Sequence, residues 1–149
     1  MKYKLEETLS HDALLLGRVT YEGFAAAWPD MEDEAGFADK MNSMKKYVVS
    51  STLTDPSWNN TEVLGPDLKA EIERIKGEPG NDILIGGSVQ LVRGLLALDL
   101  VDEIRLMTFP IVLGSGKRLF GESEEPITLQ LASSQPLKSG TVILTYRRP

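Results

Sequence analysis

The sequence contains no cysteine, and this absence limits both its covalent and its metal chemistry. A chain without cysteine has no disulfide framework, no thiol nucleophile and no thiolate metal site. Its single histidine, His11, lacks a second histidine or a cysteine as partner, so we expect a surface histidine and no metal centre. The lack of cysteine also fits a reducing cytoplasm, which is the compartment we predict.

Long apolar runs are also absent. The longest, residues 24–28, is far shorter than the ~20 residues that a membrane-spanning helix needs. Residues 1–9 mix charged and apolar side chains and lack the apolar core of a signal peptide. We therefore predict no membrane partner and no export.

Basic residues are outnumbered, because 16 Lys and Arg stand against 22 Asp and Glu, for a net charge of −6. A chain with this negative charge repels a phosphate backbone, and no basic stretch offsets the repulsion, so nucleic acid is not an expected partner.

The length of 149 residues and the hydrophobic content of 42% are typical of one globular domain, residues 1–149.

Short apolar segments alternate with segments of helical periodicity through most of the chain. We expect strands at residues 12–16, 46–50, 62–64, 82–85 and 103–112, and helices at residues 20–27, 31–44, 68–75 and 88–98. Residues 127–131 and 141–147 instead alternate with period two around a turn at 138–140. The order predicts an α/β fold with a mainly parallel sheet and an antiparallel C-terminal edge.

A strand-to-helix turn, Leu16-Gly17-Arg18-Val19-Thr20, follows the first predicted strand. Backbone amides at a helix N-terminus carry partial positive charge and bind phosphates. Gly17, Arg18 and Thr20 are therefore candidate phosphate ligands. An ordinary turn explains the same residues, with Thr20 capping the helix and Arg18 in solvent.

A second turn, Ile85-Gly86-Gly87-Ser88, repeats this arrangement after a later strand. Glycine lets a ligand approach the main chain, so these four residues are candidate cofactor ligands. The G-x-G-x-x-G spacing of the dinucleotide fingerprint is absent. A tight turn that binds nothing remains the alternative, with Ser88 as the N-cap of the next helix.

A third glycine-rich segment, Leu113-Gly114-Ser115-Gly116-Lys117-Arg118, fails as a nucleotide-triphosphate loop. The Walker pattern requires a glycine at the position of Ile111 and a hydroxyl residue at that of Arg118. We interpret the segment as a turn that leaves a strand.

Residues 15–28, LLGRVTYEGFAAAW, resemble the cofactor helix of dihydrofolate reductase-like proteins. Three further segments agree, at residues 46–53, 82–91 and 100–120, the last with its run VLGSGKRLF. Together they are similar to the bacterial group related to the reductase domain of the bifunctional riboflavin-biosynthesis deaminase/reductase. The resemblance implies a dihydrofolate reductase-like three-layer αβα sandwich and NADPH as hydride donor.

The resemblance also implies positions for the cofactor. Phosphates would lie on Gly17, Arg18 and Thr20, the adenosine ribose and its 2′-phosphate near Ser50 and Ser51, and the pyrophosphate against Gly86, Gly87 and Ser88. The peptide bond between Gly86 and Gly87 is expected to be cis.

Members of this group begin with a β-strand, and this chain is expected to start after it. A substrate-protonating acid would be lost with that strand, so no catalytic residue is named. A missing strand would leave unpaired backbone groups, which predicts self-association as a homodimer.

The predicted function is hydride transfer from NADPH to a small heterocyclic or ribosylaminopyrimidine/pterin-like substrate, as in riboflavin biosynthesis. The cofactor would carry the chemistry, and the protein would orient it and exclude water. Two alternatives remain open: a non-catalytic nucleotide-binding module, and a domain-swapped structural protein that binds no cofactor.

Overall fold

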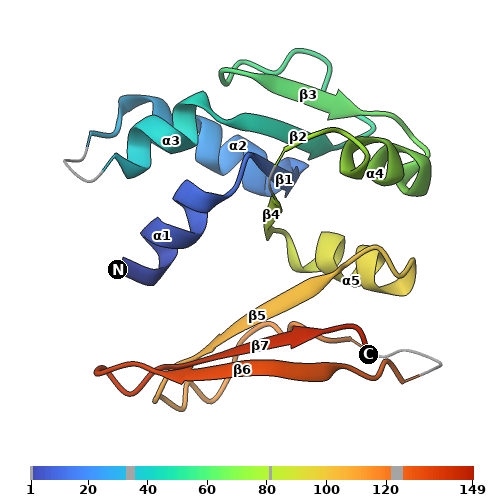
Figure 1. The fold of residues 1–149 in the computed structure, drawn as a ribbon. Helices are drawn as coiled ribbons and strands as arrows, with labels where there is room; N and C mark the ends of the chain where they lie inside the picture. The colour runs from blue at the N-terminus through green and yellow to red at the C-terminus, as the bar shows by residue number, and fades with distance from the viewer. Residues whose placement is uncertain (1, 33–35, 81, 122–125) are drawn as a thin grey trace. The chain divides into compact units, whose positions relative to one another are not determined.

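The computed structural model describes residues 2–32, 36–80, 82–121 and 126–149, which fall into two compact units (Figure 1). Residues 1–94 are called the N-terminal unit and residues 95–149 the C-terminal unit. The elements before the boundary are α1 (Lys2–Ser10), β1 (Ala13–Gly17), α2 (Arg18–Ala27), a 3-10 turn η1 (Trp28–Asp30), α3 (Phe37–Ser43), β2 (Lys45–Val49), β3 (Thr61–Leu64), α4 (Leu68–Lys76) and β4 (Ile83–Gly87). Helix α5 (Val89–Ala97) crosses the boundary, and β5 (Glu103–Thr108), β6 (Gln130–Pro136) and β7 (Val142–Arg147) follow it.

The N-terminal unit is built on a four-stranded parallel sheet in the order β3-β2-β1-β4. Its inner strand β1 has the sequence ALLLG, and the four residues before the glycine are at most 5% exposed. A continuous apolar run is expected for a parallel strand that is covered on both faces. The sheet therefore confirms the parallel part of the predicted fold.

Helices cover both faces of this sheet. Leu14 and Leu16 point to one face, where they share a buried cluster with Tyr21 of α2 and with Met41 of α3. On the other face, the Tyr47 hydroxyl donates to Glu78, which follows α4. Because neighbouring strand residues point to opposite faces, α2 and α3 form one layer and α4 the other, which is an αβα arrangement.

A lysine is fully buried in the first of these layers. The Lys46 ammonium donates to the carbonyl oxygens of Asn42, at 2.6 Å, and Asn59, at 2.9 Å, and lies 4.2 Å from the ring centre of Trp58. Asn42 also accepts from Trp58 Nε1 at 2.8 Å. Lys46 thus ties the end of α3 to the loop between β2 and β3.

The free energy of unfolding is expected to rise between pH 8 and pH 10. Burial lowers the pKa of Lys46 to about 8, from 10.5, so in this range the unfolded chain holds a proton that the folded chain has lost. Burial and the hydrogen bond to Glu78 raise the pKa of Tyr47 to about 12, so stability falls again above pH 10. Urea unfolding at several pH values measures the trend. A flat profile between pH 8 and pH 10 would contradict it.

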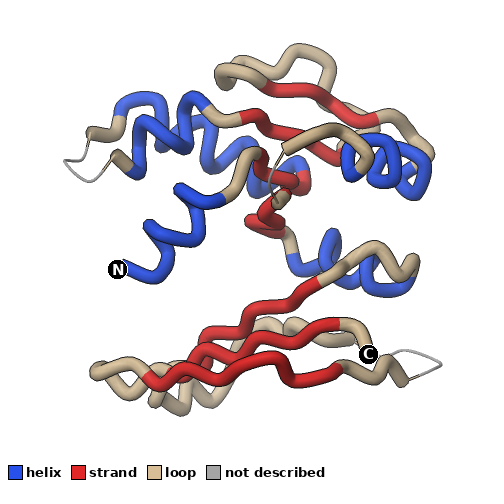
Figure 2. Tube along the Cα trace, in the orientation of Figure 1, coloured by secondary structure: helices blue, strands red, loops and turns tan. Residues whose placement is uncertain are grey.

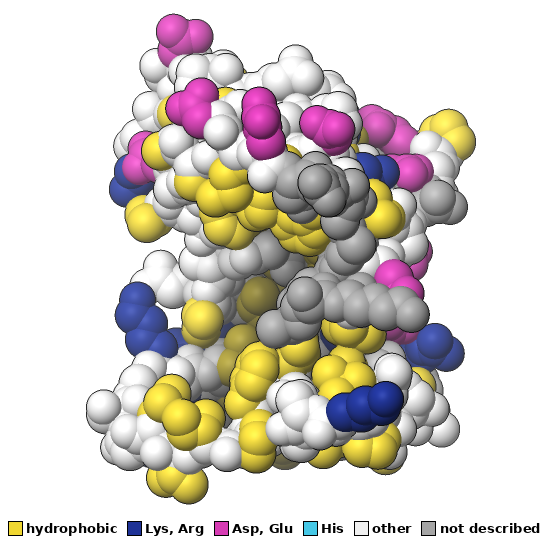
Figure 3. All heavy atoms as spheres, turned by 90° about the vertical axis from the view of Figure 1, so that its left-hand side faces the viewer, with side chains coloured by type: hydrophobic (Ala, Val, Ile, Leu, Met, Phe, Trp, Pro, Cys, Tyr) yellow, Lys and Arg dark blue, Asp and Glu magenta, His cyan; other side chains and the backbone are white. Residues whose placement is uncertain are grey.

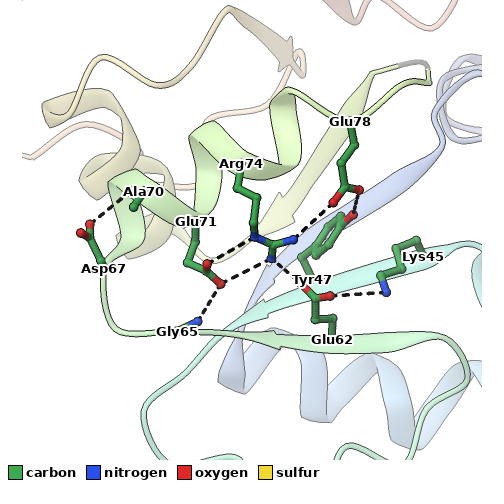
Figure 4. Close-up of polar contacts among 9 residues, drawn as sticks. All are labelled: Lys45, Tyr47, Glu62, Gly65, Asp67, Ala70, Glu71, Arg74 and Glu78. Carbon is green, nitrogen blue, oxygen red and sulfur yellow. Dashed lines mark hydrogen bonds and ion pairs between the residues drawn. The ribbon is translucent and has the colours of Figure 1, made fainter.

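Charged side chains hold α4 against β3 (Figure 4). Arg74 contacts Glu62 at 2.6 Å, Glu78 at 3.3 Å and Glu71 at 3.4 Å, while Glu71 also accepts from the amide of Gly65 at 2.9 Å. That amide and the Arg74 guanidinium lower the pKa of Glu71. Since three carboxylates satisfy one guanidinium, we interpret this cluster as an anchor for the helix.

The C-terminal unit contains a three-stranded antiparallel sheet in the order β5-β7-β6. The hairpin between β6 and β7 turns at residues 137–141, where Gly140 has a φ of 89°. This confirms the antiparallel pairing, the turn and the strand predicted at residues 141–147. The strand predicted at residues 127–131 was placed too early, because β6 spans Gln130–Pro136. The strand predicted at residues 103–112 was too long, because β5 ends at Thr108. In the described antiparallel sheet, β5 lies at an edge (Figure 2). Pro110 has no amide hydrogen to continue a ladder.

Large apolar side chains are exposed on the C-terminal unit (Figure 3). They are Leu98, Phe109, Ile111, Val112, Leu113, Phe120, Ile127 and Leu131. Four of the eight, Phe109, Ile111, Val112 and Leu113, follow β5 directly, which is why the sequence suggested a longer strand.

The first helix and His11 correct the sequence analysis. No helix was predicted at residues 2–10, where α1 lies, and it packs against α3. His11, expected at the surface, is 5% exposed, and its Nδ1 contacts the carbonyl oxygen of Glu7. The helix brings this carbonyl to the ring nitrogen, a contact that the sequence position of His11 alone does not reveal. In the described part of the chain, no helix is long and apolar enough to cross a membrane.

Candidate cofactor site

The candidate site lies at the carboxyl edge of the parallel sheet. There Gly17 at the end of β1 pairs with Val49 of β2, and Leu16 pairs with Gly87 of β4. Three strands therefore end side by side, spaced by about 4.8 Å. Ligands of open α/β sheets bind outside the carboxyl ends of the strands. The topology brings together the two glycine turns that were predicted as phosphate sites, and it places Ser50 beside them.

The two glycine turns contact each other closely. A Cβ atom on Gly17 would lie 3.1 Å from Ser88 Oγ, and a Cβ atom on Gly87 would lie 3.1 Å from Thr20 Oγ1. Gly87 also has a φ of 135°, which L side chains rarely adopt. Gly87 therefore requires glycine, whereas a side chain at Gly17 would press on the Ser88 hydroxyl. The hydroxyl groups of Thr20 and Ser88 lie between the two turns. The cis peptide bond expected between Gly86 and Gly87 lies instead between Gly87 and Ser88.

Two helices begin at this edge. Gly17 is the N-cap of α2 and supplies no capping side chain. Thr20 lies inside the helix, so its alternative role as a cap is wrong, because α2 starts at Arg18 and not at Thr20. Ser88 caps α5 as predicted, since its Oγ accepts from the amide of Leu91 at 3.4 Å. Amides at both helix starts favour an anionic ligand.

Arg18 is the first residue of α2 and pairs with Glu22 one turn later. Its Nη1 lies 3.1 Å from Glu22 Oε1 and 3.0 Å from Oε2, and both side chains are about half exposed. The sequence analysis named Arg18 but missed Glu22. The signal was available, because residues four apart on a helix are neighbours.

The loop after β2 carries Ser50 and Ser51. Ser50 Oγ accepts from the amides of Thr52 at 3.1 Å and Leu53 at 3.0 Å, so this oxygen already organises the turn. Ser51 is exposed at the same end of the sheet. Ile85, by contrast, lies within β4 and pairs with Leu15 of β1.

The sequence of this chain is similar to a known protein family over most of its length. The sequence profile described as "RibD C-terminal domain" matches residues 2–143. The chain belongs to the RibD C-terminal domain family. It is 33% identical to the uncharacterized protein YyaP of Bacillus subtilis strain 168 over 138 residues, which cover 91% of this chain and 73% of that protein.

Solved structures of this family and its neighbours share the fold. A protein named for riboflavin biosynthesis, from Shewanella sp. PV-4, is 25% identical, with a TM-score of 0.77 over 99% of this chain and 78% of its own. Dihydrofolate reductase from Enterococcus faecalis, complexed with NADP(H), is 17% identical, with a TM-score of 0.65 over 99% of this chain and 80% of its own. The dihydrofolate reductase-like fold expected from the sequence is thereby confirmed, and a reductase fold is established.

Proposed function

We propose that this chain is an NADPH-dependent reductase of a small heterocyclic or ribosylaminopyrimidine/pterin-like substrate. The observation that carries the proposal is the pair of glycine turns at the carboxyl edge of the sheet, where Gly17 packs against Ser88 and Gly87 against Thr20, so that two helix starts lie together. A family of reductase domains and a structural neighbour complexed with NADP(H) support it.

The residues present fit a dinucleotide. The helix starts at Arg18 and Val89 would bind the pyrophosphate, with the hydroxyls of Thr20 and Ser88 beside it. Ser51 follows β2, which lies two strands from β4 in the sheet. That separation is about 10 Å, a distance at which the adenosine ribose would lie if the pyrophosphate bound beside β4. When bound, the cofactor supplies the hydride, and these residues orient it.

Turnover tests the proposal. The loss of NADPH absorbance is measured in the presence of ribosylaminopyrimidine or pterin substrates. The rate of NADPH oxidation is expected to increase in proportion to enzyme concentration. Calorimetric titration of NADPH alone supplies the control, with micromolar affinity expected. Binding without oxidation of any substrate would favour a non-catalytic nucleotide-binding module, whereas no binding would contradict the proposal altogether.

We also propose that the chain acts in the cytoplasm as a homodimer, with a small molecule rather than nucleic acid or membrane as its partner. Strand β6 supports the dimer, because all its residues are exposed and it lies at an edge of the described antiparallel sheet. An edge strand offers unpaired amides and carbonyls to a second copy. Sedimentation equilibrium is expected to give twice the chain mass, and a monomer at micromolar concentration would contradict this part.

A further inference from the structure

Residues 51–60, which connect β2 to β3 and are called the strap, are attached at two points. At the start, Ser50 Oγ accepts from two amides of the strap, at 3.1 and 3.0 Å. Near the end, the side chain of Trp58 is 4% exposed and belongs to the buried cluster of the N-terminal unit. Residues 54–57, between the two attachments, are exposed or half-buried. The strap is therefore held at its two ends rather than along its length.

Trp58 attaches the end of the strap to two helices. Its amide donates to the hydroxyl of Tyr21 on α2 at 3.0 Å, and its Nε1 donates to Asn42 Oδ1 on α3 at 2.8 Å. The Tyr21 hydroxyl also lies 3.3 Å from Oγ1 of Thr61, the first residue of β3. Each hydrogen bond contributes little net free energy, so the loss of a few of them would release this end of the strap.

Lys46 is the group that the strap covers. It is 0% exposed, and its ammonium donates to the carbonyl oxygen of Asn42 and to that of Asn59 in the strap. Among the described residues, no carboxylate forms an ion pair with it, and burial lowers the pKa of Lys46 to about 8. A buried cation without a counter-ion gains hydration when the segment that covers it moves away. Opening of the strap therefore favours the protonated form of Lys46.

Other titratable or charged side chains lie on the elements around Lys46, and none of those described is hydrogen-bonded to its ammonium. They are Arg18, Tyr21 and Glu22 of α2, Asp30 of η1, Asp39 and Lys40 of α3, Lys45 and Tyr47 of β2, Asp55 of the strap and Glu62 of β3. Lys45 and Tyr47 point to the opposite face of the sheet, because they are the strand neighbours of Lys46. Burial, rather than a charged neighbour, thus governs the proton on Lys46.

We infer that the strap is a proton-linked conformational device, in which a proton on Lys46 favours the open strap and loss of that proton favours the closed one. The open strap binds the proton more tightly, so opening must depend on pH between the pKa values of the two forms. Opening is expected to be constant below pH 8 and to become about 30-fold less frequent between pH 8 and pH 10. The inference does not depend on the proposed function, although the strap includes Ser51 of the candidate site.

Competitive acetylation of the full chain between pH 7 and pH 10 tests the inference, with each lysine followed by mass spectrometry. Only a neutral and exposed amine reacts, so Lys46 is labelled only through the open strap. Above pH 8 the neutral fraction of the open form rises about ten-fold per pH unit, while opening falls by the same factor. Labelling of Lys46 is therefore expected to level off above pH 8. Labelling of the partly exposed Lys45 should keep rising to pH 10.

Two tyrosine variants separate opening of the strap from global unfolding, which urea denaturation measures. Tyr21→Phe removes the acceptor of the Trp58 amide, so labelling of Lys46 should rise about 3–10-fold beyond any change in the global unfolding constant. Tyr47→Phe is the matched control, because it removes a hydroxyl that contacts Glu78 on the other face of the sheet. It is expected to change labelling of Lys46 only as much as it changes global unfolding.

Two results would overturn the inference. One is a labelling rate of Lys46 that keeps rising to pH 10 in parallel with that of Lys45. The other is a rate that never exceeds the value set by global unfolding, because the strap would then not open on its own. Neither result bears on cofactor binding, since no cofactor is present in the experiment.

Discussion

Replacing Lys46 by methionine is expected to lower the free energy of unfolding by about 2–4 kcal/mol. The substitution removes a buried ammonium that donates to the carbonyl oxygens of Asn42 and Asn59, 2.6 and 2.9 Å away. It also removes the interaction with the Trp58 ring. Chemical denaturation followed by tryptophan fluorescence measures the loss, because both tryptophans, Trp28 and Trp58, lie in the N-terminal unit.

Lys45→Met is the control for this experiment. Lys45 is the preceding residue, and its ammonium forms a longer, partly exposed ion pair with Glu62 at 3.8 Å. Its replacement is expected to cost less than about 1 kcal/mol. Equal losses in both variants would show that the buried ammonium of Lys46 does not hold the loop to α3. The rise in stability between pH 8 and pH 10 should also disappear in Lys46→Met.

Replacing Gly87 by alanine is expected to lower the affinity for NADPH more than about 100-fold. The new methyl group would approach Thr20 Oγ1 to 3.1 Å at a φ of 135°, so the main chain of the turn must move. Loss of two of the hydrogen bonds that the turn would donate to phosphate, at about 1.5–3 kcal/mol each, would account for a decrease of this size. Calorimetry measures the affinity, and circular dichroism reports whether the fold persists.

A second variant separates binding from folding. In the Gly17→Ala variant, alanine introduces no backbone strain, because Gly17 has an ordinary φ of −74°. The new methyl group would press only on Ser88, whose Oγ atom lies 3.1 Å away. We expect a folded protein with weakened NADPH binding. Gly23→Ala is the control, because nothing lies within 4 Å of its new Cβ atom and alanine favours the helix. Unchanged affinity in Gly87→Ala and Gly17→Ala alike would contradict the assignment of the turns.

From β1 onward the sequence predicted the order of strands and helices, because the apolar periodicity is local. The helix predicted at residues 31–44 was too long, since in the described residues only Phe37–Ser43 is helical. The run ALLL of β1 indicated a buried strand, and Ser88 indicated a helix start, since both signals lie within a few residues. The two glycine turns were also named in advance. Their contact was not, because the approach of Gly17 to Ser88 depends on how β1 pairs with β4.

Other features depend on long-range packing and escaped prediction for that reason. Lys46 begins a predicted strand and gave no sign of burial, yet carbonyls from α3 and from the loop before β3 surround its ammonium. The segment after Thr108 has the composition of a strand, but its apolar side chains are exposed and Pro110 interrupts the ladder. Composition gives the propensity of a segment, whereas pairing partners decide its structure.

The central claim is that a dinucleotide binds at the carboxyl edge of the parallel sheet, and amide chemical-shift mapping tests it most directly. Titration of NADPH into ¹⁵N-labelled protein is expected to shift the amides of Gly17, Arg18, Gly87 and Ser88 first, with those of Ser50 and Ser51. Shifts confined to other parts of the chain, such as α4 or the β6–β7 hairpin, would contradict the claim.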